Sequence, residues 1–179
     1  MVARSSRCRV VADVRHRHAA RDLDECLARD LLAGAGLGLA LFLLTVIVVA
    51  PALYALITLV TGDRVTPPSQ PILPDEPNTR QIALGGFAAV VAAPVAEEGF
   101  FRGFLFGALR RRFRFPAAAG LSGALFGAFH VIPLLIPVMI FVGIGLAYVY
   151  ERRGSLFASI AAHSAFNVVG YTIIVLSIT

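Results

Sequence analysis

The sequence predicts an all-α fold, a polytopic transmembrane helical bundle of about five spans. Of the 179 residues, 58% are hydrophobic and only 15% are charged, and the mean hydropathy is +0.79. This composition is too apolar for a soluble domain of this size. The apolar residues form long stretches between short polar segments, and a helix needs about 20 apolar residues to cross a bilayer.

The charges also indicate a membrane protein. The net charge of +5 rests on arginine, because the chain contains no lysine, and the arginines cluster between the apolar stretches. Membrane topology explains this distribution better than nucleic-acid binding does, so we expect a lipid bilayer and no nucleic acid as a partner.

The N-terminal part of the chain divides into three expected segments. Residues 1–30 are polar and arginine-rich and should form a cytoplasmic basic arm, in which both cysteines, Cys8 and Cys26, are expected to be free thiols. Residues 31–61 should form a leading transmembrane helix, with Gly34, Gly36 and Gly38 as a close-packing face for another helix. Residues 62–80 are rich in proline and polar side chains, which favours an extracytoplasmic loop.

Residues 81–179 form the expected membrane catalytic domain. The second span should begin near Gln81, bend at Pro94 and end at the arginines 110–114. Three further spans are expected, at about 117–132, 138–150 and 155–179. Five spans place every arginine cluster on one side, which is then the cytoplasm. We therefore expect a multi-pass protein of the cell membrane with a cytoplasmic N-terminus and an extracytoplasmic C-terminus.

Few residues inside the apolar stretches can ionise, and a charge at membrane depth costs roughly 2.5–3.5 kcal/mol. Glu98 and Arg102 lie four residues apart, on one face of a helix, where they can pair. Glu97 is turned about 100° away from Glu98. We expect a structural role for the Glu98–Arg102 pair and a chemical role for Glu97.

Three helices bring polar groups to a similar depth. At a rise of about 1.5 Å per residue, Glu97, His130 and His163 lie roughly 20, 21 and 15 Å from the expected cytoplasmic ends of their helices. Phe126 with His130, and His163 with Asn167, are also pairs four residues apart on one helix face. If the helices pack together, Glu97, His130, His163 and Asn167 converge on one buried site, with Phe126 as a wall.

Two hydrolytic chemistries fit this set. Glu97, His130 and His163 could hold a divalent metal ion, with zinc first, that activates a water molecule. Without metal, Glu97 assisted by His130 could activate water as a general base, while His163 and Asn167 stabilise an oxyanion. A serine mechanism is disfavoured, because Ser164 lies about 100° around the helix from His163.

The order of these motifs resembles the CPBP family of intramembrane proteases, which includes type II CAAX prenyl endopeptidases and abortive-infection-like proteins. The family pattern is Glu-Glu-x-x-x-Arg, then Phe-x-x-x-His, then His-x-x-x-Asn or Asp on successive membrane helices. Its three parts stand here at 97–102, 126–130 and 163–167. The resemblance covers roughly Gln81 to Ile178.

This resemblance implies a membrane endopeptidase with a CAAX-protease-like core. Glu97 and His130 would activate water or bind metal, and His163 and Asn167 would complete the metal site or the oxyanion hole. The substrate would be a membrane-associated protein or peptide, and nothing in the sequence reports on prenyl groups or on the oligomeric state. Two rival functions use the same polar cluster: a catalytically silent membrane binding or immunity protein, and a small ion or proton transporter. The absence of an inverted repeat disfavours the transporter.

Overall fold

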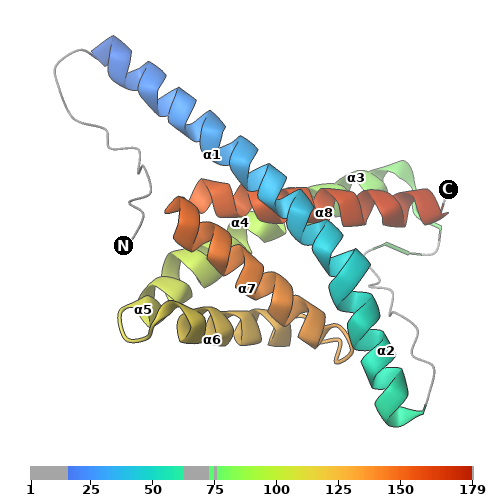
Figure 1. Cartoon of the computed structure of the whole chain (residues 1–179). Coiled ribbons are helices and arrows are strands. Elements are labelled where there is room, and N and C mark those ends of the chain that lie inside the picture. Colours follow the sequence, from blue (N-terminus) through green and yellow to red (C-terminus); the bar gives the residue numbers. More distant parts are fainter. Residues whose placement is uncertain (1–15, 63–72, 75, 179) are drawn as a thin grey trace.

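The computed structural model describes residues 16–62, 73–74 and 76–178, and helices are the regular secondary structure of this part of the chain (Figure 1). This confirms the predicted all-α class. The α-helices (α) and π-helical segments (η) are, in order, α1 (His16–Leu44), η1 (Thr45–Val49), α2 (Ala50–Thr61), α3 (Thr79–Phe87), η2 (Ala88–Ala92), α4 (Ala93–Glu98), η3 (Gly99–Phe106), α5 (Gly107–Arg110), α6 (Phe115–Ala128), α7 (Ile136–Arg153) and α8 (Leu156–Ile178).

Three helical stretches in the described part of the chain are long and apolar enough to cross a membrane. They are Leu23–Thr61, Thr79–Arg110 and Leu156–Ile178. The third and fourth predicted spans correspond to α6, an apolar helix of 14 residues, and to α7, which has 18 residues and ends in Glu-Arg-Arg. The chain is therefore a helical membrane bundle in which three of the five predicted spans meet these criteria by themselves.

The first helix begins earlier than the sequence suggested. The predicted span starts at Leu31, and α1 runs without a break from His16, because the preceding segment consists mainly of residues that favour helix and contains no glycine or proline. The predictions for residues 1–15 and 63–72 lie outside the described residues. Cys26 is disulfide-bonded, so the expectation of a free thiol at that position is wrong. Whether a thiol finds a partner depends on the path of the chain, which the sequence alone does not show.

The second long helix starts with a capping box. The Asn78 side chain accepts a hydrogen bond from the Gln81 backbone N–H, and the Gln81 side chain accepts one from the Asn78 N–H, both at 2.9 Å. These bonds satisfy two N–H groups that a helix start leaves without partners. The helix therefore begins at Thr79, two residues before the predicted start, and continues through η2, α4 and η3 to Arg110.

Glycines allow the closest helix contacts. A Cβ atom at Gly34 or Gly38 would lie 2.2 Å or 2.0 Å from the carbonyl oxygen of Ala158 or Ala162, respectively. A pair of small residues four apart on α1 thus packs against a similar pair on α8, and Figure 1 shows α1 crossing α8. The predicted packing face is confirmed for these two glycines, whereas Gly36 has nothing within 4 Å of its Cβ position.

Helix α6 ends at Ala128, before the predicted end of the third span at Ile132. Pro133 explains this difference, because proline lacks the N–H that the next helical turn needs and disfavours helical geometry at the residue before it. His130 therefore lies in the turn after α6 and not on the helix, as we had predicted. In this turn the Ile132 N–H donates to the His130 carbonyl at 2.6 Å, around Val131 with a φ of 54°.

Candidate active site

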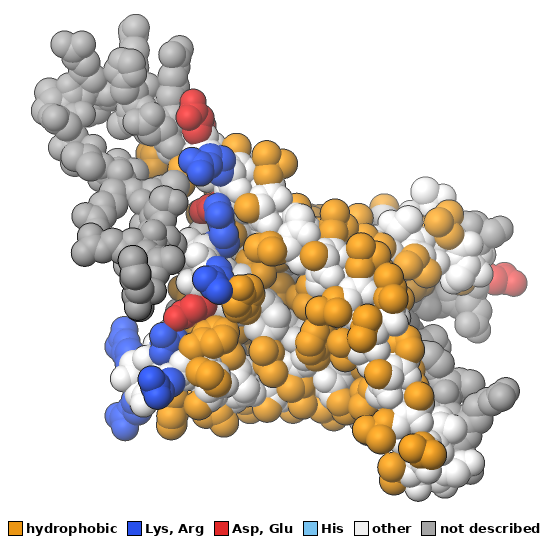
Figure 2. Space-filling view, in the orientation of Figure 1, with side chains coloured by type: hydrophobic (Ala, Val, Ile, Leu, Met, Phe, Trp, Pro, Cys, Tyr) orange, Lys and Arg blue, Asp and Glu red, His pale blue; other side chains and the backbone are white. Residues whose placement is uncertain are grey.

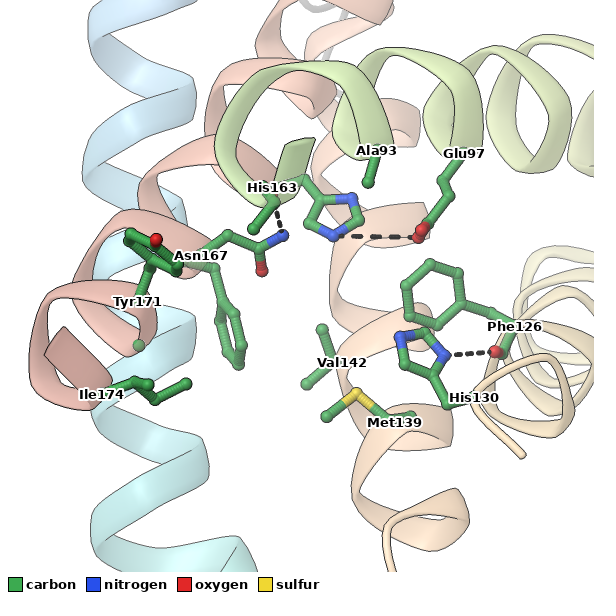
Figure 3. Close-up of a pocket in the computed structure, with 13 residues that line it drawn as sticks. Ala93, Glu97, Phe126, His130, Met139, Val142, His163, Asn167, Tyr171 and Ile174 are labelled. Atoms are coloured by element: carbon green, nitrogen blue, oxygen red, sulfur yellow. Dashed lines mark hydrogen bonds and ion pairs between the residues drawn. The ribbon is translucent and has the colours of Figure 1, made fainter. Parts of the chain in front are cut away.

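The four predicted catalytic residues line one pocket of about 340 Å³ (Figure 3). Glu97 comes from α4, His130 from the turn after α6, and His163 and Asn167 from α8. The predicted convergence of three chain segments is therefore present in the structure. The rest of the lining is mostly apolar: Ala89, Ala93, Phe126, Met139, Val142, Phe166, Gly170, Tyr171 and Ile174.

Glu98 lies beside this pocket at the centre of a fully buried hydrogen-bond network. Its Oε1 atom accepts hydrogen bonds from Arg102 Nη1 at 2.7 Å and from His163 Nδ1 at 3.0 Å. Its Oε2 atom accepts one from the Ser159 hydroxyl. Both carboxylate oxygens are thus occupied, and the side chains of Glu98 and Arg102 are 0% exposed.

Arg102 joins this network to α7. Its Nη2 atom donates to the Gly143 carbonyl oxygen at 2.9 Å, and its guanidinium carbon lies 4.8 Å from the centre of the Phe126 ring. A Cβ atom at Gly143 would come within 3.1 Å of Phe126 Cβ, so the absence of a side chain there allows this packing. The expected Glu98–Arg102 pair is present, and it connects three helices rather than one.

Glu97 differs from Glu98 in its surroundings. Its Oε2 atom is buried and has no hydrogen-bond partner, and it lies 3.9 Å from His163 Nε2. The side chain is 33% exposed and lines the pocket. Two adjacent glutamates therefore have different environments: one carboxylate is held by three donors, and the other has a free oxygen at the pocket wall.

Hydrogen bonds orient both histidines. His130 Nδ1 lies 2.9 Å from the Phe126 carbonyl oxygen. A carbonyl can only accept, so this nitrogen carries the proton. His163 Nδ1 lies 3.0 Å from Glu98 Oε1, and its proton is held there in the same way. In each ring Nε2 is the nitrogen left for other chemistry, because a partner on the far nitrogen fixes the tautomer and the ring plane.

Phe126 contacts both histidines of the site. It is 0% exposed, and its ring centre lies 4.8 Å from that of His130 and 5.7 Å from that of His163. Phe101 packs on it edge to face at 5.2 Å. Phe126 therefore fixes the spacing of the two imidazoles, as a wall of the pocket.

Ser159, which is not among the predicted site residues, is 0% exposed, and its hydroxyl donates to Glu98. Its position gave one usable signal, because Ser159 lies four residues before His163 and so shares its helix face. The Gly143 carbonyl is not among the predicted site groups either, and it is 41 residues from Arg102 in the sequence. No sequence pattern identifies a backbone acceptor at that separation.

The geometry does not assemble the metal site considered above. In the described residues no three side chains of His, Cys, Asp or Glu gather closely enough to hold a metal ion. Glu97 Oε2 and His163 Nε2 lie 3.9 Å apart, but no third side chain of these types joins them in the described part of the chain. We therefore derive no chemical step through a metal.

The pocket lies within a region of the chain that matches a known protein family. The model of the family described as type II CAAX prenyl endopeptidase Rce1-like matches residues 79–169, just over half of the chain. The match includes Glu97, His130, His163 and Asn167. No curated protein and no solved structure gave a significant match. The chain belongs to the Rce1-like family of type II CAAX prenyl endopeptidases.

Proposed function

We propose that the protein is an intramembrane endopeptidase that hydrolyses a peptide bond in a membrane-associated protein or peptide. One observation carries the proposal: Glu97 lines the pocket with a carboxylate whose Oε2 makes no hydrogen bond and lies 3.9 Å from His163 Nε2, on the wall that it shares with His130 and Asn167. A free carboxylate beside oriented imidazoles is suited to general acid–base chemistry. The membership in a protease family supports the same reaction class.

In the proposed reaction the Glu97 carboxylate takes a proton from a water molecule, with His130 Nε2 helping to orient that water. The hydroxide attacks the carbonyl carbon of the peptide bond, and the electron pair of the C=O bond moves to its oxygen. Asn167 donates a hydrogen bond to this oxyanion, and His163 donates one through Nε2 when its ring carries a proton on both nitrogens. When the tetrahedral intermediate collapses, the C–N bond breaks and the proton held by Glu97 passes to the leaving amine.

The adjacent Glu98 has a different task in this mechanism. Because Arg102, Ser159 and His163 all donate to it, it has no free oxygen for a water molecule. It holds the His163 ring so that Nε2 faces Glu97 and the pocket. Paired carboxylates in unlike environments commonly divide the work in this way.

A divalent metal, with zinc first, held by Glu97, His130 and His163 is the alternative mechanism. The donor types suit zinc, but the described side chains do not form a three-ligand cluster. The two mechanisms differ in their response to metal removal, which is one of the predictions below.

We also propose that the arginine-rich end of the bundle faces the cytoplasm. Figure 2 shows arginines gathered at one end of the molecule. There Arg153 pairs with Asp30 at 2.6 Å, and Arg110 pairs with Glu151 at 2.8 Å, so the end of α7 meets both α1 and the end of α5. Clustered arginine favours the cytoplasmic side. The disulfide at Cys26 favours the opposite side, because the cytosol is reducing. Labelling of single cysteines introduced at each end of the bundle, in intact cells, decides the orientation.

The function is tested with Glu97→Gln, which keeps the shape of the side chain and removes the base. New protein N-termini are compared in native-host membranes that contain wild-type protein or the variant at matched, folded levels. We expect termini that appear only with the wild type, and a loss of cleavage rate of about 10²–10⁴-fold on a peptide that spans such a site.

Glu98→Gln is the matched control. Its amide NH₂ would replace one of the two carboxylate oxygens and would face either Ser159 or the pair Arg102 and His163, so this variant should lose thermal stability as well as activity. Glu97→Gln should keep an unfolding temperature close to that of the wild type, because Glu97 Oε2 makes no hydrogen bond and lies 3.9 Å from His163 Nε2. If no new terminus depends on Glu97, the catalytically silent membrane binding protein becomes the better description.

A further inference from the structure

The hydrogen bond that holds Asn167 has an unusual acceptor. Asn167 Nδ2 donates to the backbone carbonyl oxygen of Ala89 at 2.8 Å (Figure 3). Ala89 lies in η2, in the middle of a continuous helix, where carbonyl oxygens normally accept from the N–H four residues later. A carbonyl inside a helix should therefore have little need of a side-chain donor.

The local backbone explains why this carbonyl is available. The Ala93 N–H, which would bond Ala89 in an α-helix, donates instead to Ala88. In this π-helical register the donor for Ala89 would be residue 94, five positions later. Residue 94 is proline, which has no N–H. The Ala89 carbonyl is thus left without its helical donor, and the Asn167 amide takes that place.

We propose that Pro94 is a positioning residue for Asn167. By withholding an N–H from Ala89, Pro94 creates the acceptor that fixes the plane of the Asn167 amide at the pocket wall. One N–H of Nδ2 is then committed to Ala89, and the second N–H and Oδ1 are the groups left to meet a substrate. This inference rests on the proposed function for its catalytic consequence, but not for the contact itself.

Two features of the chain provide matched controls. Tyr171 lies one turn further along α8 and donates in the same way to the Ile82 carbonyl, at 2.5 Å. The residues four and five positions after Ile82 are Gly86 and Phe87, both of which have an N–H. Pro51 follows the π segment η1 much as Pro94 follows η2, but it is not part of the pocket lining.

The first measurement is a double-mutant cycle of thermal stability in detergent. In Asn167→Ala the Ala89 carbonyl loses its donor, and adding Pro94→Ala supplies a backbone N–H that can replace it. Pro94→Ala should therefore change the unfolding temperature more favourably in the Asn167→Ala background than in the wild type. Its effect should be the same in the Tyr171→Phe background as in the wild type, and Pro51→Ala should show no coupling to Asn167→Ala.

The second measurement is cleavage of a peptide identified by the N-terminus comparison. Loss of the Asn167 amide should lower kcat by about 10²–10³-fold, as expected for an oxyanion donor. Pro94→Ala should lower kcat by about 10-fold or more with little change in KM, because the amide is present but misdirected. The double variant should be no slower than Asn167→Ala alone.

The outcomes separate this inference from the proposed function. Equal shifts in unfolding temperature in both backgrounds overturn the Pro94–Asn167 connection, whatever the activity. If the loss of kcat in the double variant equals the product of the losses in Pro94→Ala and Asn167→Ala, the positioning role of Pro94 is overturned. If the two substitutions are coupled in unfolding temperature but the protein cleaves no peptide, the Pro94–Asn167 connection is supported and the proposed function is overturned.

Discussion

The packing of α1 against α8 predicts that Gly38→Ala displaces the catalytic helix. Gly38 faces the carbonyl of Ala162, the residue before His163. The matched change is Gly36→Ala, which adds the same methyl group two residues away on the same helix. Gly36 has nothing within 4 Å of its Cβ position, so the two variants differ only in what the new methyl group meets.

The size of the effect follows from the contact. A Cβ atom at residue 38 would lie 2.0 Å from the Ala162 oxygen, and such contacts are essentially never under 3.0 Å, so the helices must separate by about 1 Å. Overpacking of this kind typically costs about 1–3 kcal/mol. A displacement of about 1 Å near the chemistry can lower the rate by about 100-fold.

The assay is thermal unfolding in detergent together with peptide cleavage for both variants. Gly38→Ala should lower the unfolding temperature and the cleavage rate. Gly36→Ala should leave both unchanged or raise stability slightly, because alanine favours helix over glycine by about 0.8–1.0 kcal/mol. Similar behaviour of the two variants would show that the α1–α8 contact does not hold His163 in place.

Two further predictions concern the site. Ser159→Ala removes the donor to Glu98 Oε2 and should lower the free energy of unfolding, measured in detergent, by about 1–3 kcal/mol, because a buried carboxylate oxygen loses its partner. Ser159→Thr keeps a hydroxyl and should restore the wild-type stability. An unchanged free energy of unfolding in the alanine variant would contradict this role of the hydroxyl. Treatment with a metal chelator should leave the cleavage rate of the purified protein unchanged, since the described side chains form no three-ligand cluster. Loss of activity with the chelator and its recovery with zinc would establish the metal mechanism instead.

Several features could be predicted from the sequence because they depend on neighbours along one helix. The pairing of Glu98 with Arg102 follows from their spacing, and the small-residue face at Gly34 and Gly38 follows from the four-residue repeat. The convergence of Glu97 with His163 followed from matched depth, since costly polar groups in a membrane protein face one another rather than lipid. Each of these inferences used local periodicity or burial.

Other features did not follow from that reasoning. The sequence contains Pro133, but we extended the third span past His130, although the proline ends the helix at Ala128. Because the helix ends before His130, the ring of His130 is oriented by its hydrogen bond to the Phe126 carbonyl and not by a continuing helix. The first helix begins at His16, ahead of the apolar stretch, because helix propensity does not depend on hydropathy.

The sequence by itself determined an all-α membrane protein, the residues that can do chemistry, and the segments that carry them, because hydropathy and helical spacing are local properties. Only the tertiary structure decided which donors from other helices reach each glutamate. Glu97 and Glu98 are chemically identical neighbours, and they differ because donors from α8 and η3 reach Glu98 and leave one oxygen of Glu97 unpaired. Tertiary structure also matched Asn167 with a carbonyl 78 residues away. Such pairings depend on how helices pack, and no local pattern encodes them.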